Sequence, residues 1–151
     1  MVSPLHTLRC RTVAASRFRQ LTHIRDLPVL IVDEPSGISD PDPAPHPLEI
    51  LLAALGSDLA IGIRAMAVTR GVTLSSLELE VEADMARAPL DSGAPPPLGL
   101  EAVRVAIHIA ADAPREALAA LIMRATLRSP VANTLHDGTQ LSVALAAGTG
   151  V

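Results

Sequence analysis

The alternation of hydrophobic and polar positions predicts three short strands at the start of the chain. Segments 6–13, 19–24 and 28–33 are rich in Val, Ile, Thr and Leu, which favour extended backbone, and polar residues separate them. Residues 34–46 follow with four prolines together with Gly, Ser and Asp. We therefore expect N-terminal strands over about 1–33 and then a Pro-rich loop.

A long apolar helix is predicted at 47–71. Pro47 and Glu49 suit the first helical turn, and Gly71 suits a C-terminal stop. Apolar residues occupy nearly every side of this segment, which is typical of a helix that is buried all round or lies in a membrane. Charged residues, Asp58 among them, interrupt the span and favour a buried helix in a soluble protein. In so short a chain, burial on all sides predicts a second subunit.

Two amphipathic strands are predicted after the helix. At 77–84 Leu, Val and Ala alternate with three glutamates and an aspartate, and at 103–109 Val and Ile alternate with residues that include Arg104 and His108. Each pattern predicts one packed face and one exposed face. Antiparallel pairing would place Arg104 opposite the acidic row, and the intervening segment 86–99, with three consecutive prolines, is predicted to be a loop.

The last part of the chain predicts two helical segments and a strand. Apolar residues at helical spacing indicate a helix that Asp112 caps, that Pro114 begins and that ends before Pro130. A further helical turn is predicted at 131–136, and a strand at 139–145 follows an Asp-Gly turn.

The resulting order, βββ-α-ββ-αα-β, indicates an α+β domain with antiparallel sheets around a central helix rather than alternating βαβ units. We expect a single domain over 1–151, of which 72–151 form the ββααβ portion. A hydrophobic content of 49% with 19% charged residues predicts a folded core despite 13 prolines.

Charge and aromatic content argue against several classes of partner. The 12 basic residues are all Arg and face 16 acids, for a net charge of -4, whereas nucleic-acid binding needs a basic surface. One Phe without Trp or Tyr provides no stacking platform or aromatic cage. The start of the chain has neither a signal-peptide nor a transit-peptide pattern, so we expect a cytoplasmic protein with no membrane partner.

The single cysteine, Cys10, alternates with Leu8 and Thr12 in a strand-like run, which predicts a small buried hydrophobe. One cysteine per chain also excludes a mechanism that needs two cysteines of one chain.

Two segments together, 46–72 and 125–135, resemble the OsmC/Ohr superfamily of osmotically induced and organic-hydroperoxide-resistance proteins. That family shows a Pro-x-Glu-Leu-Leu helix start, an Ala-Leu-Gly-x-Cys turn, an Arg-Gly-Val exit and a later Cys-Pro-Val-x-x-x-Leu segment. The corresponding residues are Pro47-Leu48-Glu49, Ala54-Leu55-Gly56-Ser57-Asp58, Arg70-Gly71-Val72, and Ser129-Pro130-Val131 through Leu135.

The resemblance implies an OsmC-like fold and an intertwined homodimer, with the central helices in its core and two pockets at the subunit interface. In active members a thiolate on the central helix attacks a hydroperoxide, and a second cysteine resolves the sulfenic acid into a disulfide. Here Asp58 occupies the peroxidatic position and Ser129 the resolving position. The resemblance therefore predicts that thiol-dependent peroxidase activity is absent.

Four interpretations of Asp58 follow. It belongs to an inactive site, paired with Arg17, Arg19 or Arg25 or capped by backbone donors. It is a general base or an acceptor that orients a ligand. It binds a metal together with His46, although the histidines lack ligand spacing. It was introduced to imitate an oxidised cysteine.

The candidate pocket residues are Glu49, Asp58, Ser129, His46 and Leu55. Glu49 aligns with the family glutamate that orients a pocket arginine, although a helix start alone also explains it. His46 faces the pocket mouth or solvent, and Ser129 is interpreted as structural because no adjacent base is identifiable.

The leading functional hypothesis is binding of a small apolar or amphipathic molecule at the dimer-interface pocket, without a cofactor or metal. The alternatives are a cysteine-independent enzyme that uses Asp58 as acid or base, and an inactive structural homologue.

Overall fold

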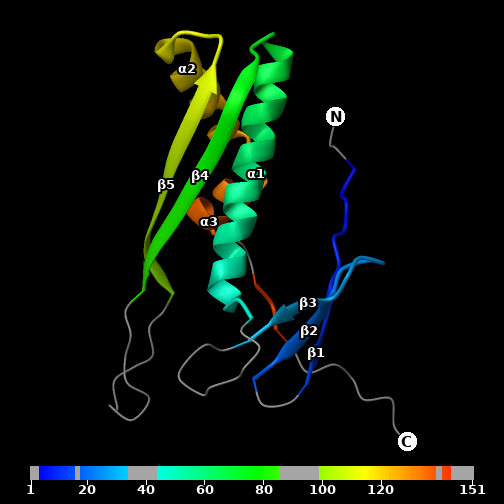
Figure 1. Cartoon of the computed structure of the whole chain (residues 1–151). Helices are drawn as coiled ribbons and strands as arrows, with labels where there is room; N and C mark the ends of the chain where they lie inside the picture. The colour runs from blue at the N-terminus through cyan, green and yellow to red at the C-terminus, as the bar shows by residue number, and fades with distance from the viewer. Residues whose placement is uncertain (1–3, 16–17, 34–43, 86–98, 139–140, 144–151) are drawn as a thin grey trace, which may run out of the picture. The chain divides into compact units, whose positions relative to one another are not determined.

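The computed structural model describes residues 4–15, 18–33, 44–85, 99–138 and 141–143. They divide into two compact units, Met1–Ala53 and Ala54–Val151, and the long helix α1 begins in the first and continues through the second. In chain order the elements are β1 (Arg11–Ala14), β2 (Gln20–His23), β3 (Leu30–Val32), α1 (Pro47–Thr69), β4 (Leu74–Met85), β5 (Leu100–Ala111), α2 (Arg115–Leu127) and α3 (Pro130–Asp137) (Figure 1). The predicted α+β class is confirmed.

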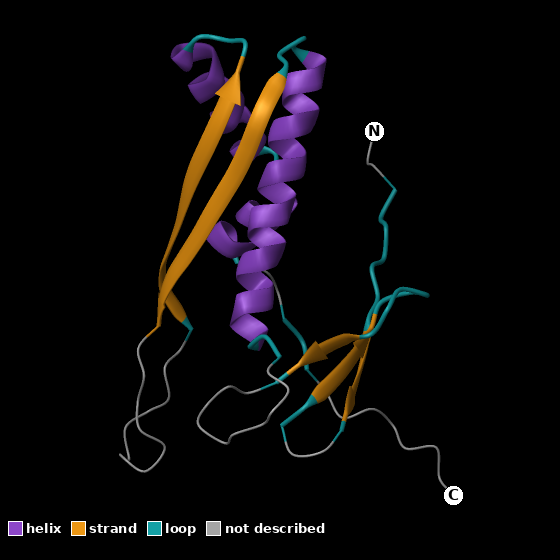
Figure 2. Ribbon diagram, viewed as in Figure 1, coloured by secondary structure: helices purple, strands orange, loops and turns teal. Residues whose placement is uncertain are grey.

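The N-terminal unit contains an antiparallel sheet of order β1-β2-β3, visible as the three short strands of Figure 2. Its register pairs Thr12 with Thr22 and Leu21 with Ile31, and the two threonine hydroxyls are hydrogen-bonded at 2.9 Å. All three strands were predicted, but each is shorter than its hydrophobic pattern suggested.

The prediction that Cys10 is buried is wrong, because the residue is exposed. β1 begins only at Arg11, and residues 4–10 before it are exposed and have no regular secondary structure. The alternation of Leu8, Cys10 and Thr12 therefore does not mark a face that is covered within the described part of this chain.

The C-terminal unit is built on the β4–β5 hairpin, whose strands are 12 residues long. Figure 1 shows α1 running along this hairpin. A Cβ atom at Gly56 of α1 would lie only 3.1 Å from Cγ2 of Val81, so glycine permits the close approach of helix and strand. The core comprises Ile63 and Ala67 of α1, Leu121 and Ala125 of α2, and the packed faces of the hairpin: Leu74, Leu77, Leu79, Ile107 and Ile109.

Only one stripe of α1 is buried within this chain, formed by Leu55, Leu59, Ile63 and Ala67 at every fourth position. Other apolar positions are open, and Ile61 is 69% exposed. The expectation of burial all round is therefore not met by one chain alone. By length and composition α1 could cross a membrane, but its buried stripe is that of a core helix.

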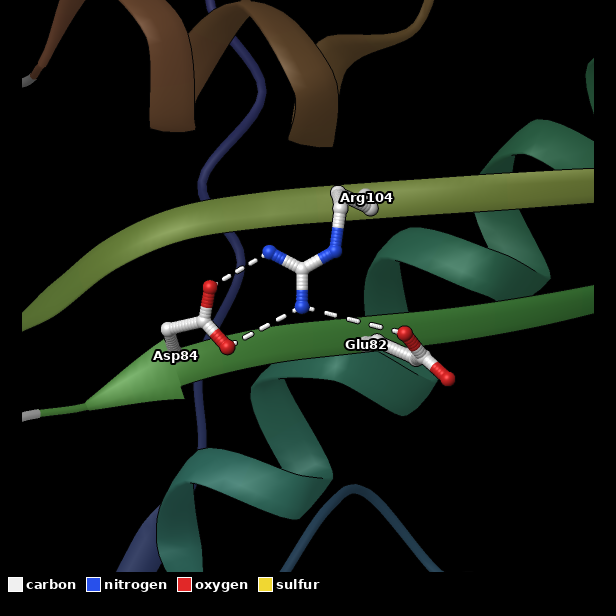
Figure 3. Close-up of polar contacts among 3 residues, drawn as sticks. All are labelled: Glu82, Asp84 and Arg104. Carbon is white, nitrogen blue, oxygen red and sulfur yellow. Dashed lines mark hydrogen bonds and ion pairs between the residues drawn. The ribbon is translucent and has the colours of Figure 1, made fainter.

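The outer face of the hairpin holds an ion-pair cluster formed by Glu82, Asp84 and Arg104 (Figure 3). Glu82 and Arg104 face each other in the register, which confirms the predicted pairing. Arg104 donates two hydrogen bonds to Asp84, at 2.5 and 3.0 Å, and its Nη2 lies 3.7 Å from Oε2 of Glu82. The predicted surface position of His108 is also confirmed, and its Nε2 lies 3.3 Å from Oε2 of Glu80.

These contacts with Arg104 determine the direction in which the pKa of Asp84 is shifted. Hydrogen bonds from Arg104, and then its charge, lower the pKa of Asp84 below its ordinary value of 3.8. Because the folded pKa is lowered, the ion pair's stabilisation is present above pH 3.8 and is lost as the pH falls through the folded pKa. We expect Arg104→Gln to return the pKa of Asp84 to about 3.8, measured by NMR of the side-chain carboxyl. An unchanged pKa in this variant would contradict the assigned cause, and Arg115→Gln is the control.

The helices after β5 correct two predictions. Asp112 does not cap α2, whose N-cap is Pro114 with no side-chain hydrogen bond. Instead Asp112 accepts a hydrogen bond of 2.7 Å from the backbone N–H of Thr73 and ties the end of β5 to the start of β4. α3 extends the helical turn predicted at 131–136. Of the strand predicted at 139–145, residues 141–143 are not in a strand and the rest lie outside the described residues, as do 34–43 and 86–98 of the predicted loops.

Candidate functional site

His46 and Glu49 form the start of α1. The carboxylate of Glu49 accepts a hydrogen bond of 2.8 Å from the backbone N–H of His46, and Nδ1 of His46 accepts one of 3.1 Å from the N–H of Leu48. This reciprocal arrangement satisfies two backbone donors at a helix start, as a capping box does. Helix capping therefore accounts for both residues, and orientation of an arginine by Glu49 is not needed to explain it.

Asp58 lies three turns further along α1, half-buried beside the buried Leu55 and Leu59. Its Oδ2 accepts a hydrogen bond of 2.5 Å from the hydroxyl of Ser129 and one of 3.2 Å from the backbone N–H of Val131. The structure thus brings together Asp58 and Ser129, the two residues that the sequence resemblance matched to the family's redox cysteines, although 71 residues separate them in sequence.

Ser129 is 3% exposed and is the N-cap of α3. Its hydroxyl donates to Asp58 and accepts a hydrogen bond of 3.0 Å from the N–H of Ala132. We call this group, Asp58 and Ser129 with the N–H groups of Val131 and Ala132, the Asp58–Ser129 clamp. It joins the middle of α1 to the start of α3, and hydrogen bonds to a charged acceptor make such a junction strong.

The second oxygen of Asp58, Oδ1, has no partner among the described residues. No buried side-chain oxygen or nitrogen in that part of the chain lacks a hydrogen bond, so Oδ1 must be accessible. Asp58 therefore has one oxygen held by two donors and one oxygen free to accept a hydrogen bond from a ligand or water.

The predicted partners of Asp58 need correction. Among the described residues it pairs with no arginine: Arg19 bonds to Asp33 at 3.2 Å and Arg25 is exposed, whereas Arg17 lies outside the described residues. The alternative of backbone capping is met in part, by the N–H of Val131.

The sequence identified no base adjacent to Ser129, whereas in the structure Asp58 is hydrogen-bonded to it. Sequence could not show this contact, since it depends on how α3 packs against α1. Near-complete burial of the hydroxyl nevertheless keeps a substrate from Ser129, and its two hydrogen bonds give it a structural role.

The surroundings of Asp58 on α1 are uneven. Leu55, a predicted pocket residue, is buried at 5% exposure and packs inside the chain. Ile61 and Ala65, which follow Asp58 on the same helix, are exposed. For a metal, the described residues offer no group of three or more His, Cys, Asp or Glu side chains.

An open groove of about 410 Å³ lies between the C-terminal ends of α1 and α2. None of the five predicted pocket residues lines it, and sequence reasoning missed it. The only signal in the sequence was the spacing of Arg124 and Arg128, one helical turn apart. The lining of the groove consists of Met66, Thr69, Arg70, Arg124, Leu127 and Arg128.

The fold is that of OsmC-type α+β proteins, as solved structures show. An OsmC-like protein from Mycoplasma pneumoniae matches with a TM-score of 0.73 and 18% identity, over 88% of this chain and 89% of that one. An organic hydroperoxide resistance protein OsmC from Legionella pneumophila matches with a TM-score of 0.62 and 18% identity, over 89% and 92%. An OsmC-like hydroperoxide resistance protein from Jannaschia sp. matches with a TM-score of 0.58 and 25% identity, over 93% of each chain.

The sequence model of the OsmC-like protein family matches residues 39–144, and the chain belongs to this family. No curated protein is similar enough in sequence to count as a match. The matched region contains no cysteine, because Cys10 precedes it.

Proposed function

We propose that this chain is an OsmC-like protein that does not reduce hydroperoxides through thiols and that binds a small apolar or amphipathic molecule beside Asp58, as a homodimer in the cytoplasm. The observation that carries the proposal is the direct hydrogen bond between Asp58 and Ser129. The positions that resemble the family's redox pair are adjacent in this fold, and neither carries sulfur.

The two-cysteine peroxidase mechanism of the family needs sulfur at both positions. A thiolate attacks one peroxide oxygen, the O–O bond breaks, and a sulfenic acid and an alcohol form; the sulfenic acid then condenses with a second thiol to form a disulfide and water. The carboxylate of Asp58 cannot form a sulfenic acid, and the hydroxyl of Ser129 cannot form a disulfide. Cys10 is exposed and is the only thiol of the chain.

The apolar surface of α1 supports the homodimer. Ile61 and Val68 are 69% and 76% exposed, although α1 also carries the buried stripe of Leu55, Leu59, Ile63 and Ala67. A second copy that covers this surface would remove it from water, which is the usual driving force for association.

The geometry of Asp58 supports a ligand of mixed character. Its accessible Oδ1 is able to accept a hydrogen bond, and its helical neighbours include the aliphatic Leu55 and Ile61. A molecule with one hydroxyl or amine donor on an apolar body fits this arrangement. The second candidate function, acid or base catalysis by Asp58, is favoured by the same accessible oxygen and predicts a turnover that Asp58→Asn abolishes.

Peroxidase assays test the first half of the proposal. We expect the protein to consume cumene hydroperoxide with dithiothreitol no faster than a Cys10→Ser variant does. Restoring both sulfurs with Asp58→Cys and Ser129→Cys together should create dithiol-dependent turnover, whereas each single substitution should give at most a small part of it. Circular dichroism verifies that the double variant is folded. Rapid turnover by the unmodified protein that Cys10→Ser abolishes would contradict the proposal.

Native mass spectrometry of the purified protein tests the second half. We expect a dimer that carries additional small-molecule mass, and we expect Asp58→Ala to lower the retained fraction. A monomer would overturn the proposed assembly. A dimer without added mass that also fails to take up 1-octanol or a similar hydroxylated alkane would favour the inactive homologue.

A further inference from the structure

The groove between the C-terminal ends of α1 and α2 gathers three arginines around an apolar wall. We propose that it binds a small amphipathic anion, a carboxylate or phosphate head on a short alkyl chain. This site is separate from the Asp58–Ser129 clamp, whose residues do not line the groove, and the inference does not depend on the proposed function.

The charge of the groove is uncompensated. The side chains of Arg70, Arg124 and Arg128 make no ion pair or hydrogen bond with any described residue, and the lining contains no acid. Elsewhere in the described part of the chain other exposed arginines also lack an ion pair, but these three line one groove of a chain whose net charge is -4. A guanidinium group carries its charge at any physiological pH and forms paired hydrogen bonds with carboxylate or phosphate oxygens.

Helix capping does not account for these arginines. Cations are favoured at helix C-termini, where they can bond to free carbonyls. Here carbonyls near both helix ends accept from backbone donors: at the end of α1 Ala67 accepts from Arg70 and Val72, and at the end of α2 Ala125 accepts from Arg128. Only the backbone N–H groups take part, so the three guanidinium groups remain available.

Two like charges one turn apart also oppose each other. Arg124 and Arg128 stand at positions i and i+4 of the α2 C-terminal turn, where equal charges are mildly unfavourable. An anion bound between them removes the repulsion and gains charge-assisted hydrogen bonds. The arrangement is therefore more favourable with an anion than without one.

The apolar wall specifies the rest of the ligand. Met66 and Leu127 line the groove, and Leu127 is 68% exposed, so an alkyl chain that covers it removes apolar surface from water. The volume of about 410 Å³ lies in the range of small-molecule sites. No aromatic side chain lines the groove for base stacking, which favours an alkyl anion over a nucleotide.

Isothermal titration calorimetry with octyl phosphate tests the site. We expect one equivalent to bind per chain, with a Kd on the order of 100 μM. Binding of inorganic phosphate, which lacks the chain, should be at least about tenfold weaker. Binding of 1-octanol, which lacks the charge, is measured in the Asp58→Ala variant, where the site proposed for hydroxylated alkanes is altered, and should also be at least about tenfold weaker. Decanoate should bind like octyl phosphate if the shared feature is the anionic head. Absence of binding at millimolar octyl phosphate, equal binding of inorganic phosphate, or equal binding of 1-octanol in the Asp58→Ala variant would overturn the proposal.

Substitutions locate the binding. Arg124→Gln with Arg128→Gln should weaken octyl phosphate binding about tenfold or more, whereas Arg115→Gln, at the other end of α2, should leave it unchanged. Asp58→Ala should also leave it unchanged, which separates this site from the proposed function. Equal losses in the double variant and in Arg115→Gln, or loss of binding in Asp58→Ala, would place the anion elsewhere and refute the inference. The substituted residues Arg115, Arg124 and Arg128 are exposed, so the arginine variants should fold. Circular dichroism verifies the fold of these variants and of Asp58→Ala.

Discussion

Ser129→Ala is expected to lower the free energy of unfolding by about 2–4 kcal/mol. The hydroxyl is the N-cap of α3 and also donates to the carboxylate of Asp58, so one substitution removes two hydrogen bonds from a site that is 3% exposed. Loss of an N-cap costs about 1 kcal/mol and loss of a hydrogen bond to a charged group costs about 1.5–3 kcal/mol. Urea denaturation followed by circular dichroism measures the change.

Ser76→Ala is the matched control, because Ser76 is exposed in β4 and should change stability by less than about 0.5 kcal/mol. Equal effects at Ser129 and Ser76 would show that the clamp contributes nothing. A double-mutant cycle with Asp58→Ala isolates the shared hydrogen bond, and we expect a coupling energy of about 1–3 kcal/mol.

Ile63→Ala is expected to destabilise the protein by about 2–5 kcal/mol. Ile63 has 0% exposure at the centre of the C-terminal core, where α1, α2 and the hairpin meet. Truncation removes apolar contacts and leaves a cavity, while Ile63→Val should cost only about 0.5–1.5 kcal/mol. The midpoints of urea denaturation measure the stability of the two variants. If Ile63→Ala lowered stability no more than Ile63→Val does, the assignment of Ile63 to a tightly packed core would be contradicted.

Ile61→Ala provides the comparison two residues away on the same helix. Ile61 is 69% exposed within the chain, so its truncation should cost little through packing inside one subunit. If the proposed homodimer covers Ile61, the substitution should lower stability by more than this, and the loss of stability should depend on protein concentration. The pair of variants therefore separates the core within one chain from an interface between chains.

Local patterns predicted the elements of the fold well where one physical signal dominated. The helix start at Pro47 and its end near Gly71 followed from capping preferences, and α1 spans Pro47–Thr69. The alternation of Leu and Glu at 77–84 predicted β4 and its exposed acidic face. These signals are read within a few residues of the chain, so no knowledge of tertiary contacts is needed.

Burial and pairing were predicted less well, because they depend on neighbours that are distant in sequence. The run around Cys10 looked like a buried strand, yet the residue is exposed. The pattern predicted Asp112 as a helix cap, yet its carboxylate accepts a hydrogen bond from the backbone N–H of Thr73, 39 residues away in sequence. A sequence pattern shows which residues are suited to burial or to capping. Which of them are in fact buried or act as caps depends on the residues that the tertiary fold places beside them.

For the functional site, the sequence by itself determined the OsmC-like family, the α+β class and the absence of sulfur at positions 58 and 129, because all three reside in residue identity and spacing. Only the tertiary structure decided that Asp58 bonds to Ser129 and Val131 rather than to an arginine, and that three arginines share a groove with Met66 and Leu127. Side-chain hydrogen bonds act over about 3 Å, so only the packing of α1 against α2 and α3 brings these groups within reach.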